Sequence, residues 1–533
     1  MSKLFKKIAL GGALAGLMLG MAACSPPAAT PPGGSPSTDG GVIRFALYQA
    51  PTTFNPFATT NGADGEISSL QFRPLVLTRA TEFLPGLAES WEANADASVY
   101  TFHLKQFNWS DGQPITVDDV IYTYETCVNP ETASATAGQL NAVVGAADFA
   151  SGAATSIKGL KKIDAHTLEI ELAAPNAAFL GTAPTLAIVP KHVFSQIDPA
   201  ALTGNEAFRS PTVGSGPYVF SKWVTDDQIE FGPNDKSPEK HPLSALYAQF
   251  LTSDVARAQL QTGEIDIAQV APTDVAAVKA LDSVDVQLAP GGGVISLYTA
   301  LETGKLADPL VRQAIMYAIN RQAIVDNVLA GNGTVVDTML FAPDWAVPAG
   351  LTRYTYDPEK AKQLLAEAKW DFNTEIKLQI VPGQADRDQV MDIVLGQLTA
   401  IGMKVTLAQV QPAELTDLIA NHNFDLILTI QSINPSEPGS INPRWSCDGG
   451  QNISQYCNPE LDRLLKAGVA TSDQAERTKI YADANKILNY DLPAMPLYVP
   501  NTAWGSAKRV KGFNQPLPLL PLSTFAQDWS VTQ

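Results

Sequence analysis

The segment from Leu306 to Gly331 repeats apolar residues at the spacing of an α-helix. Asp308 is placed to cap a helix that starts at Pro309, where the missing N–H of proline removes no hydrogen bond. Asn320 is placed to begin a second, shorter helix, and Gly331 fits its end. This pattern predicts a packed pair of helices without a chemical role. The first buried face is expected to contain Leu310, Val311, Ala314, Ile315, Ala318 and Ile319.

Strand and helix patterns elsewhere in the chain predict an α/β protein. Residues 42–48 (VIRFALY) are typical of a buried first strand, and residues 99–104 (VYTFHL) alternate strictly, as a half-buried strand does. Thr116 and Asp119 have the spacing of a capping box and predict the start of a helix. From residue 356 to residue 429 the helix and strand patterns alternate, which indicates an α/β lobe.

The N-terminus has the pattern of an export signal. Three lysines precede an apolar run over residues 8–23, which is too short for an ordinary membrane span. The run ends in Met-Ala-Ala-Cys24, which resembles a bacterial lipobox, in which the cysteine is lipidated and becomes the first residue. We therefore expect a lipoprotein signal peptide over residues 1–23, a flexible tether over residues 24–41 and an acyl anchor on Cys24. An ordinary signal peptide with an incidental cysteine is the alternative.

Length and composition indicate a folded protein of several domains. A chain of 533 residues exceeds what one hydrophobic core normally serves, and 45% hydrophobic with 17% charged residues is typical of globular proteins. The net charge of −18 argues against nucleic acid as a partner, because phosphate binding requires concentrated lysine and arginine.

The cysteines and histidines predict neither a metal site nor a cofactor. Cys447 and Cys457 bracket a polar, glycine-containing loop in an exported chain, which predicts a disulfide. Cys127 lies in a helix-like stretch and is expected to behave as a small buried hydrophobe. The five histidines lack metal-ligand spacing, the sequence has no HExxH, and no catalytic Ser-His-Asp set can be nominated.

Short motifs in a fixed order resemble one protein family. They resemble the extracytoplasmic solute-binding proteins of family 5, the peptide and nickel receptor group of ABC importers. Each motif alone is weak, but the series covers nearly the whole chain after the tether. The motifs are WSDGQPITVDDV (109–120), IKGLKKIDAHTLEIEL (157–172), GSGPY (214–218), LQTGEID (260–266), the VRQAI segment within 306–331, YDPEKAKQLLAEA (356–368), IGMKVT (401–406) and FDL (424–426).

The resemblance implies a two-lobed fold of the class II periplasmic-binding-protein type, with an extra α+β subdomain in the first lobe. The glycines at 291–293 predict one crossing between the lobes, and the stretch over residues 492–513 predicts a second crossing back. The expected parts are lobe I over 42–80, 213–290 and 500–533, the extra subdomain over 81–212, and lobe II over 291–499.

In peptide-binding members of this family, a stretch like W-x-A-D-Y-x-D-P supplies backbone groups and an aspartate that meets the α-amine of the ligand. The corresponding stretch is QSINPSEPGSINPRW, residues 431–445. Matching the proline at Pro438 places Gln431 at the tryptophan and Asn434 at the amine-binding acid. Glu437 then matches the second acid.

An amide at position 434 leaves the mode of ligand binding open. Asn434 offers only a neutral acceptor where a carboxylate would pair with an ammonium group, and charge-assisted bonds are about twice as strong. Either Glu437 takes the role, or the ligand is N-blocked, or the ligand is not a peptide. A simple Asx turn before Pro435 is the structural alternative for Asn434.

Aromatic rings and one arginine complete the predicted ligand contacts. Phe54 and Asn55 lie in a proline-bounded loop after the first strand, where α/β sheets often bind ligands. Arg444, beside Trp445, has the fork that binds carboxylates. Core packing of the rings and a solvated arginine are the alternatives. The predicted ligand set is Phe54, Asn55, Trp345, Gln431, Ser432, Asn434, Glu437, Arg444, Trp445 and Trp504.

The predicted function is that of a lipid-anchored, monomeric receptor outside the cytoplasm, and not of an enzyme. It is expected to capture an oligopeptide-like solute between closing lobes and to deliver it to the membrane subunits of an ABC permease. The same machinery for an oligosaccharide, a metal chelate or another small metabolite is the alternative, and a secreted hydrolase is a remote one.

Overall fold

The computed structural model describes residues 40–58, 61–79, 82–301, 305–382, 385–432, 434, 436–514 and 522–532. The predicted signal peptide, Cys24 and nearly all of the predicted tether lie outside these residues. Among the described residues, no helix combines the length and the apolar character needed to cross a membrane.

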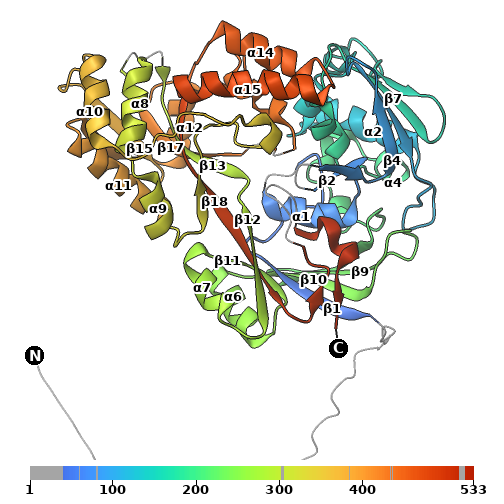
Figure 1. The fold of residues 1–533 in the computed structure, drawn as a ribbon. Helices are drawn as coiled ribbons and strands as arrows, with labels where there is room; N and C mark the ends of the chain where they lie inside the picture. The colour runs from blue at the N-terminus through green and yellow to red at the C-terminus, as the bar shows by residue number, and fades with distance from the viewer. Residues whose placement is uncertain are drawn as a thin grey trace, which may run out of the picture. The chain divides into compact units, whose positions relative to one another are not determined.

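One large mixed sheet organises the described chain (Figure 1). Its strand order is β16-β15-β17-β13-β18-β11-β1-β10-β9-β8, and β12 and β14 also pair with β18. The strands are β1 (Gly41–Leu47), β8 (Tyr218–Val224), β9 (Gln228–Pro233), β10 (Leu243–Phe250), β11 (Ile267–Val270), β12 (Val284–Pro290), β13 (Gly293–Tyr298), β14 (Gly333–Val335), β15 (Glu375–Ile380), β16 (Lys404–Gln409), β17 (Leu426–Ser432) and β18 (Ala494–Ala507).

The long strand β18 belongs to both parts of this sheet. Its beginning, from Ala494 to Tyr498, pairs with β13, whereas its end pairs with β11 and β12. The chain passes between the parts a second time at the β12–β13 junction, where the N–H of Gly291 donates a 2.7 Å hydrogen bond to the carbonyl of Pro500. The two crossings therefore lie side by side.

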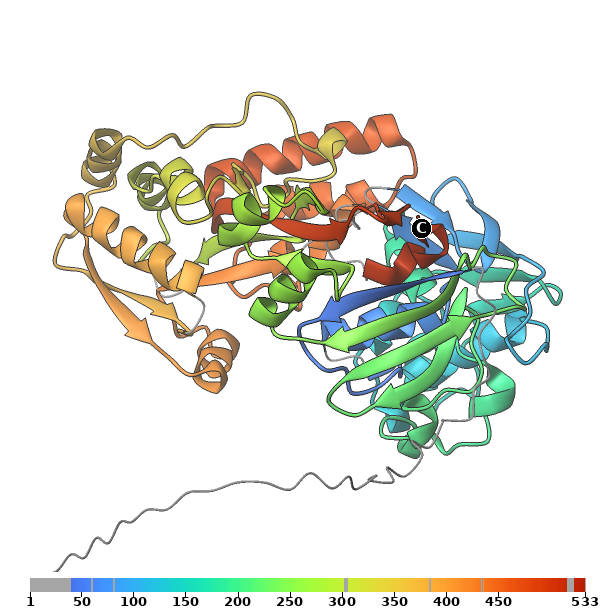
Figure 2. The same cartoon turned by 90° about the horizontal axis from the view of Figure 1, so that it is seen from below.

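The first part of the sheet is centred on β1, which pairs in parallel with β10 and β11 (Figure 2). Alternate residues of β1 point to opposite faces. Phe45 packs into the core shared with helix α1 (Gly62–Gln71), whereas Ala46 packs against helix α6 (Ser253–Thr262) and helix α7 (Val275–Lys279).

A separate four-stranded antiparallel sheet, β4-β5-β7-β6, forms within the region predicted as an extra subdomain. Helix α2 (Val117–Val128) begins at the predicted capping box, because Thr116 and Asp119 exchange backbone and side-chain hydrogen bonds. A hairpin of β2 (Val76–Arg79) and β3 (Glu82–Pro85) precedes this sheet. The four strands are β4 (Ala88–Ala93), β5 (Val99–Leu104), β6 (Leu160–Lys162) and β7 (Thr167–Glu171).

Helices cover both faces of the second part of the sheet. One hydrophobic core lies under α8 to α11, and another lies under α13 to α15. The helices are α8 (Pro309–Ala318), α9 (Arg321–Asn327), α10 (Pro358–Glu367), α11 (Ala385–Ala400), α12 (Pro412–Ala420), α13 (Asn442–Trp445), α14 (Pro459–Val469) and α15 (Gln474–Asp491).

The predicted helix pair between Leu306 and Gly331 is confirmed. The side chain of Asp308 accepts from the backbone N–H of Leu310, with Pro309 as the first residue of α8. Asn320 caps α9 in the same way, and Gly331 has a positive φ just beyond its end. Local capping chemistry and apolar spacing are thus sufficient to predict these elements.

The GSGPY turn requires glycine because of a close backbone contact and not because of its backbone angles. The sequence predicts that Gly214 and Gly216 have backbone angles that a Cβ would oppose, but neither has a positive φ. Instead, a Cβ on Gly216 would lie 1.8 Å from the carbonyl oxygen of Leu70 at the end of α1. The turn therefore requires glycine because two backbones approach closely.

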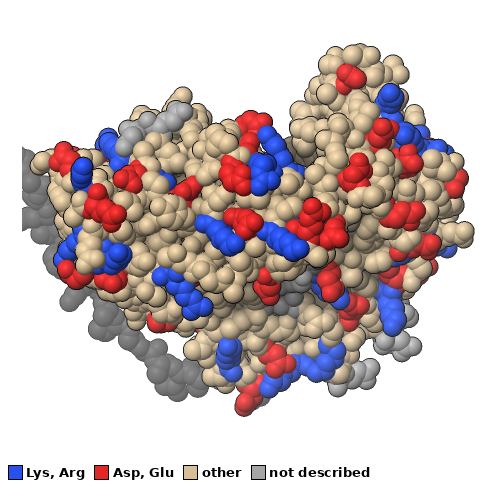
Figure 3. All heavy atoms as spheres, turned by 45° about the horizontal axis from the view of Figure 1, so that its top comes forward, with Lys and Arg blue, Asp and Glu red and all other residues tan. Residues whose placement is uncertain are grey.

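The described surface carries charges of both signs. On the face shown in Figure 3, basic and acidic side chains are interspersed, and the described residues there form no extended basic patch. This distribution differs from the concentrated positive surface that a nucleic-acid partner requires.

Candidate functional site

A cavity of about 480 Å3 lies between two segments that are far apart in the sequence. One wall is the 173–182 segment, which follows the subdomain strand β7. The opposite wall is Asn434 and the 436–443 segment, which follows β17, together with Val469 at the end of α14. This is where the subdomain meets the helices that cover the second part of the sheet.

Direct contacts hold the two walls together. The N–H of Ala177 donates a 2.7 Å hydrogen bond to the carbonyl of Val469. A Cβ on Gly181 would lie 2.8 Å from Nδ2 of Asn434, and a Cβ on Gly439 would lie 2.6 Å from Cγ1 of Val469. Glycine on each wall therefore permits an approach that a larger residue would oppose.

The loop that follows β17 is shaped by its own polar side chains. Oδ1 of Asn434 accepts from the N–H of Ser436 at 2.9 Å, which forms an Asx turn. Glu437 caps the short 3-10 helix η9 (Pro438–Ile441) by accepting from the N–H of Gly439 at 2.8 Å. Asn434 therefore uses its acceptor within the loop and turns its Nδ2 toward Gly181.

Glu437 forms a buried ion pair with Arg477 of α15. Only 3% of Glu437 is exposed, and burial raises the pKa of its carboxyl although the Arg477 guanidinium opposes this shift. Arg477 also donates to the carbonyl of Gly468 and lies over the ring of Trp345. The carboxylate of Glu437 is thus already paired inside the protein.

Two polar atoms in the cavity wall have no hydrogen-bond partner among the described residues. They are the hydroxyl oxygen of Ser440 and Oδ1 of Asn442, both shielded from solvent. Leaving such a group unpaired costs about 1–3 kcal/mol. Both residues belong to the cavity lining, but these two oxygen atoms are themselves shielded from its open space. The charged residue in the lining is Glu437, which Arg477 neutralises, so the cavity suits a neutral solute.

The family follows from a direct match to its sequence model. Residues 82–452 match the model of the bacterial extracellular solute-binding proteins, family 5 (middle region). The chain belongs to this family. It is therefore an extracytoplasmic substrate-binding receptor of an ABC transporter and not an enzyme, as its sequence predicts.

Relatives and solved structures agree with this assignment. The chain is 28% identical to the di/tripeptide-binding protein 1 of Pseudomonas aeruginosa over 484 residues, which cover 85% of this chain and 88% of that protein. An ABC transporter substrate-binding protein, CtaP, of Listeria monocytogenes has a TM-score of 0.81 at 22% identity, with 93% of this chain and 100% of that chain covered. The oligopeptide-binding protein AppA of Bacillus subtilis, solved with a nonapeptide, has a TM-score of 0.73 at 24% identity, with coverages of 93% and 99%. The predicted two-lobed α/β fold is confirmed.

Within this family 5 protein, Phe54 and Asn55 are core residues. Phe54 is fully buried and meets the rings of Phe220 and Trp223 edge to face. The amide of Asn55 donates to the carbonyl of Leu202 and accepts from a neighbouring backbone N–H. Both side chains are thus engaged within the core, and their contact with a ligand stays a prediction.

Trp445 also lies in a core, and its role as a ligand platform stays a prediction. Its ring is 1% exposed and stacks on Tyr298, with the ring centroids 6.0 Å apart. Its neighbour Arg444 is half-buried, and burial lowers the pKa of its guanidinium. Arg444 has no hydrogen bond or ion pair to any described residue, so a carboxylate contact stays a prediction for it.

The other predicted contacts are dispersed. Trp345 is half-buried against Tyr481, and Trp504 on β18 packs at the edge of the first core. Gln431 is 5% exposed, and neither polar atom of its side chain has a hydrogen-bond partner among the described residues. Ser432 is exposed. Of the ten predicted residues, the cavity brings together Asn434 and Glu437.

Sequence reasoning did not nominate the 173–182 segment, Ser440, Asn442 or Val469. The segment AAPNAAFLGT carries small and apolar residues without a chemical signature. Its role arises because the subdomain sheet carries it to the loop after β17, and this placement depends on tertiary structure alone.

A disulfide joins Cys447 and Cys457, with an S–S distance of 2.06 Å. It closes the loop between α13 and α14, and the N–H of Cys447 also donates to Asp462. Cys127 is buried, and its sulfur lies within hydrogen-bond distance of the hydroxyls of Ser134 and Thr136.

Proposed function

We propose that this family 5 protein is a lipid-anchored receptor that captures an oligopeptide-like solute between two lobes and delivers it to the permease of an ABC importer. The observation that carries the proposal is the cavity enclosed by the 173–182 and 436–443 segments. The proposed parts are lobe I over 42–80, 213–290 and 500–533, the subdomain over 81–212 and lobe II over 291–499.

Capture proceeds by closure about the two adjacent crossings. Gly291 and Pro500 connect the crossings directly, so both bend as one unit. Opening the cavity requires the Ala177–Val469 hydrogen bond to break, and a solute that contacts both walls favours the closed arrangement. No bond of the solute is broken.

The chemistry of the site favours an uncharged main chain with N–H donors. The lining residues Asn434, Ser440 and Asn442 are polar and uncharged, and the carboxylate of Glu437 is neutralised by Arg477. A peptide supplies N–H groups at regular intervals. Arg444 does not line this cavity, and a terminal carboxylate as its partner stays a separate prediction. The names of the relatives, which include peptide-binding proteins, support the same class of cargo.

Native mass spectrometry of the freshly purified full-length protein tests the cargo, because a closed cavity retains a tight ligand. The proposal predicts an added mass that fragments into amino acids. An oligosaccharide or a metal chelate as the retained species would contradict it. If the protein is recovered empty, calorimetry with a mixture of short peptides must show saturable binding, and its absence would contradict the proposal equally.

The anchor is a separate component of the proposal and rests on the Met-Ala-Ala-Cys24 sequence. Cys24→Ser should release the protein from the membrane fraction or leave its signal peptide uncleaved. Normal processing and membrane retention of this variant would exclude lipid on Cys24. We propose that the anchored receptor is a monomer and that its partners are the membrane subunits of the permease.

A further inference from the structure

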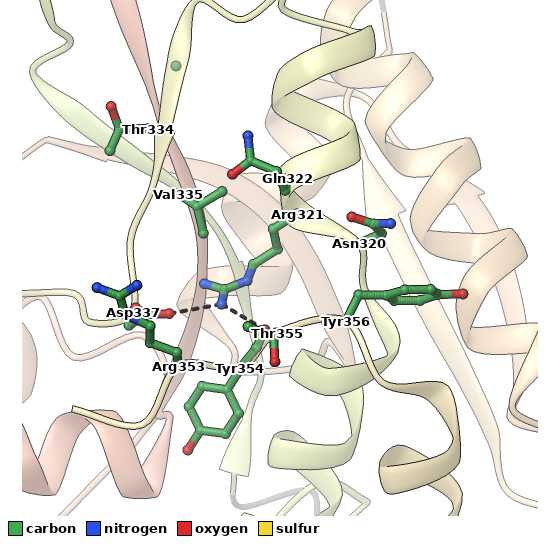
Figure 4. A pocket seen from close by; sticks show the side chains of 11 residues that line it. Asn320, Arg321, Gln322, Thr334, Val335, Asp337, Arg353, Tyr354, Thr355 and Tyr356 are labelled. Carbon is green, nitrogen blue, oxygen red and sulfur yellow. Dashed lines mark hydrogen bonds and ion pairs between the residues drawn. The ribbon is translucent and has the colours of Figure 1, made fainter. Parts of the chain in front are cut away.

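A second cavity, of about 560 Å3, shares no lining residue with the first (Figure 4). Its walls come from the start of α9, from β14 and from the 353–356 segment. Nothing in the receptor function described above uses it. Its volume lies within the range of small-molecule sites.

Arg321 forms the buried floor of this cavity. It is 4% exposed and donates to Asp337 at 2.9 Å and to the carbonyl of Tyr354 at 2.9 Å, as the dashed lines in Figure 4 mark. It also donates to the carbonyl of Val336 at 2.6 Å. These bonds fix the guanidinium in place, and Asp337 neutralises its charge.

Arg353 supplies a second positive charge that no described residue neutralises. It is exposed on the cavity wall, and its guanidinium makes no hydrogen bond or ion pair within the described ranges. The charged residues lining the cavity are thus two arginines and one aspartate, which leaves one net positive charge in a protein whose formal charge is −18.

The cavity lining also contains neutral hydrogen-bond donors. The hydroxyls of Thr334, Thr355 and Tyr356 line the cavity and form no hydrogen bond with any other residue that the structure describes. Asn320 uses its Oδ1 to cap α9, and its Nδ2 has no such partner either. The ring of Tyr356 is 47% exposed and adds a flat apolar surface.

We propose that this cavity is a second binding site for a small oxyanion, a carboxylate or a phosphate, separate from the site between the lobes. The planar fork of Arg353 matches two oxygen atoms of such a group, and the hydroxyl donors can complete its coordination. Because Arg353 is not part of the buried Arg321–Asp337 pair, it can bind the anion while that pair stays intact.

The site also lies against the crossing between the lobes. β14 pairs with β18 at Tyr498, Val499 and Pro500. The side chain of Asn332, which lies between α9 and β14, donates to the carbonyl of Pro272 at 3.0 Å. This hydrogen bond joins the α9–β14 connection to lobe I. An anion bound here therefore contacts the strand that is hydrogen-bonded to the crossing.

Isothermal titration of the solute-free protein with inorganic phosphate and, separately, with succinate tests the proposal and distinguishes the two anions. At low ionic strength, at least one should bind saturably with one site per chain. Arg353→Gln should weaken that binding at least tenfold, and Arg353→Lys should weaken it less. Because Arg353 is exposed and unpaired, both variants are expected to fold normally.

Lys279→Gln, which removes an exposed cation on α7 in lobe I, serves as the matched control and should leave anion binding unchanged. The proposal is overturned if neither anion binds saturably in the millimolar range. It is also overturned if Arg353→Gln and Lys279→Gln have the same effect, since this would show only general charge attraction.

Discussion

The N–H of Ala177 donates a 2.7 Å hydrogen bond to the carbonyl of Val469, and this bond connects the subdomain to the end of α14. It is a backbone contact, so it does not depend on side-chain chemistry that the sequence could reveal. It encloses the cavity beside Asn434 and Ser440, and it must break when the lobes separate.

Removing one member of the Glu437–Arg477 pair should destabilise the fold. The pair is buried, and leaving one charge unpaired typically costs about 3–5 kcal/mol. Arg477→Leu should therefore lower the midpoint of urea unfolding strongly, whereas the double variant Arg477→Leu/Glu437→Leu should recover most of the loss. Equal stability of the single variant and the wild type would show that the pair is not buried in solution.

The wild-type protein should hardly distinguish a peptide from its N-acetylated analogue. Asn434 already uses its Oδ1 to accept from Ser436, and Glu437 is paired with Arg477, so neither is free to meet an ammonium group. Asn434→Asp should gain about tenfold preference for the free amine, which corresponds to about 1.4 kcal/mol. Calorimetry with the matched peptide pair measures this, and a strong wild-type preference for the free amine would contradict the account.

Glu66 should make the stability depend on pH. Burial raises the pKa of its carboxyl to about 7, although the N–H groups of Leu522 and Ser523 donate to it. The native state therefore retains a proton that the unfolded chain loses near pH 4.5. As the pH rises from about 4.5 to 7, this residue lowers the free energy of unfolding by about 3 kcal/mol.

Glu66→Gln should flatten this dependence. Denaturant unfolding at pH 5, 6, 7 and 8 compares the variant with the wild type and with Glu367→Gln, an exposed control at the end of α10. The difference between wild type and Glu66→Gln should grow with pH and then level off above pH 7. If the free energies of unfolding of wild type and Glu66→Gln differ by the same amount at every pH from 5 to 8, Glu66 does not titrate within this range, which would contradict the prediction.

The disulfide should stabilise the loop that follows α13. Cys447 and Cys457 are separated by 10 residues, and loop-closure entropy for so short a loop corresponds to about 2–3 kcal/mol. Replacing both with serine should lower the free energy of unfolding by about that amount. A reductant should destabilise the wild type but not the variant, and an equal effect on both would argue against a contribution from this bond.

Local patterns predict the elements of this fold better than they predict the site. Asp308 and Asn320 identify two helix starts, because capping depends on neighbours along the chain. Phe54 and Trp445 could not be assigned in the same way, since an aromatic residue in a loop has the same sequence signature whether it packs in a core or faces a ligand. The structure places both in cores.

The site segment itself illustrates the same limit. Alignment to the family located the loop after β17, including Asn434, because the motif is contiguous in the sequence. The facing 173–182 segment comes from a different part of the chain and is brought there by the subdomain sheet. The close approach at Gly181 is likewise a property of two surfaces, and a single sequence records only that glycine is present.

Hydrogen–deuterium exchange with and without a mixture of short peptides tests the central claim most directly. If the solute is held between the two walls, the 173–182 and 436–443 segments should gain protection together, while α6 remains unchanged. Gly181→Val should abolish this joint protection, because its side chain would meet Asn434. Gly138→Val on the subdomain should retain it, because the nearest atom to its Cβ would be Nδ2 of Asn141 at 3.9 Å. Saturable peptide binding that protects neither segment would contradict the account.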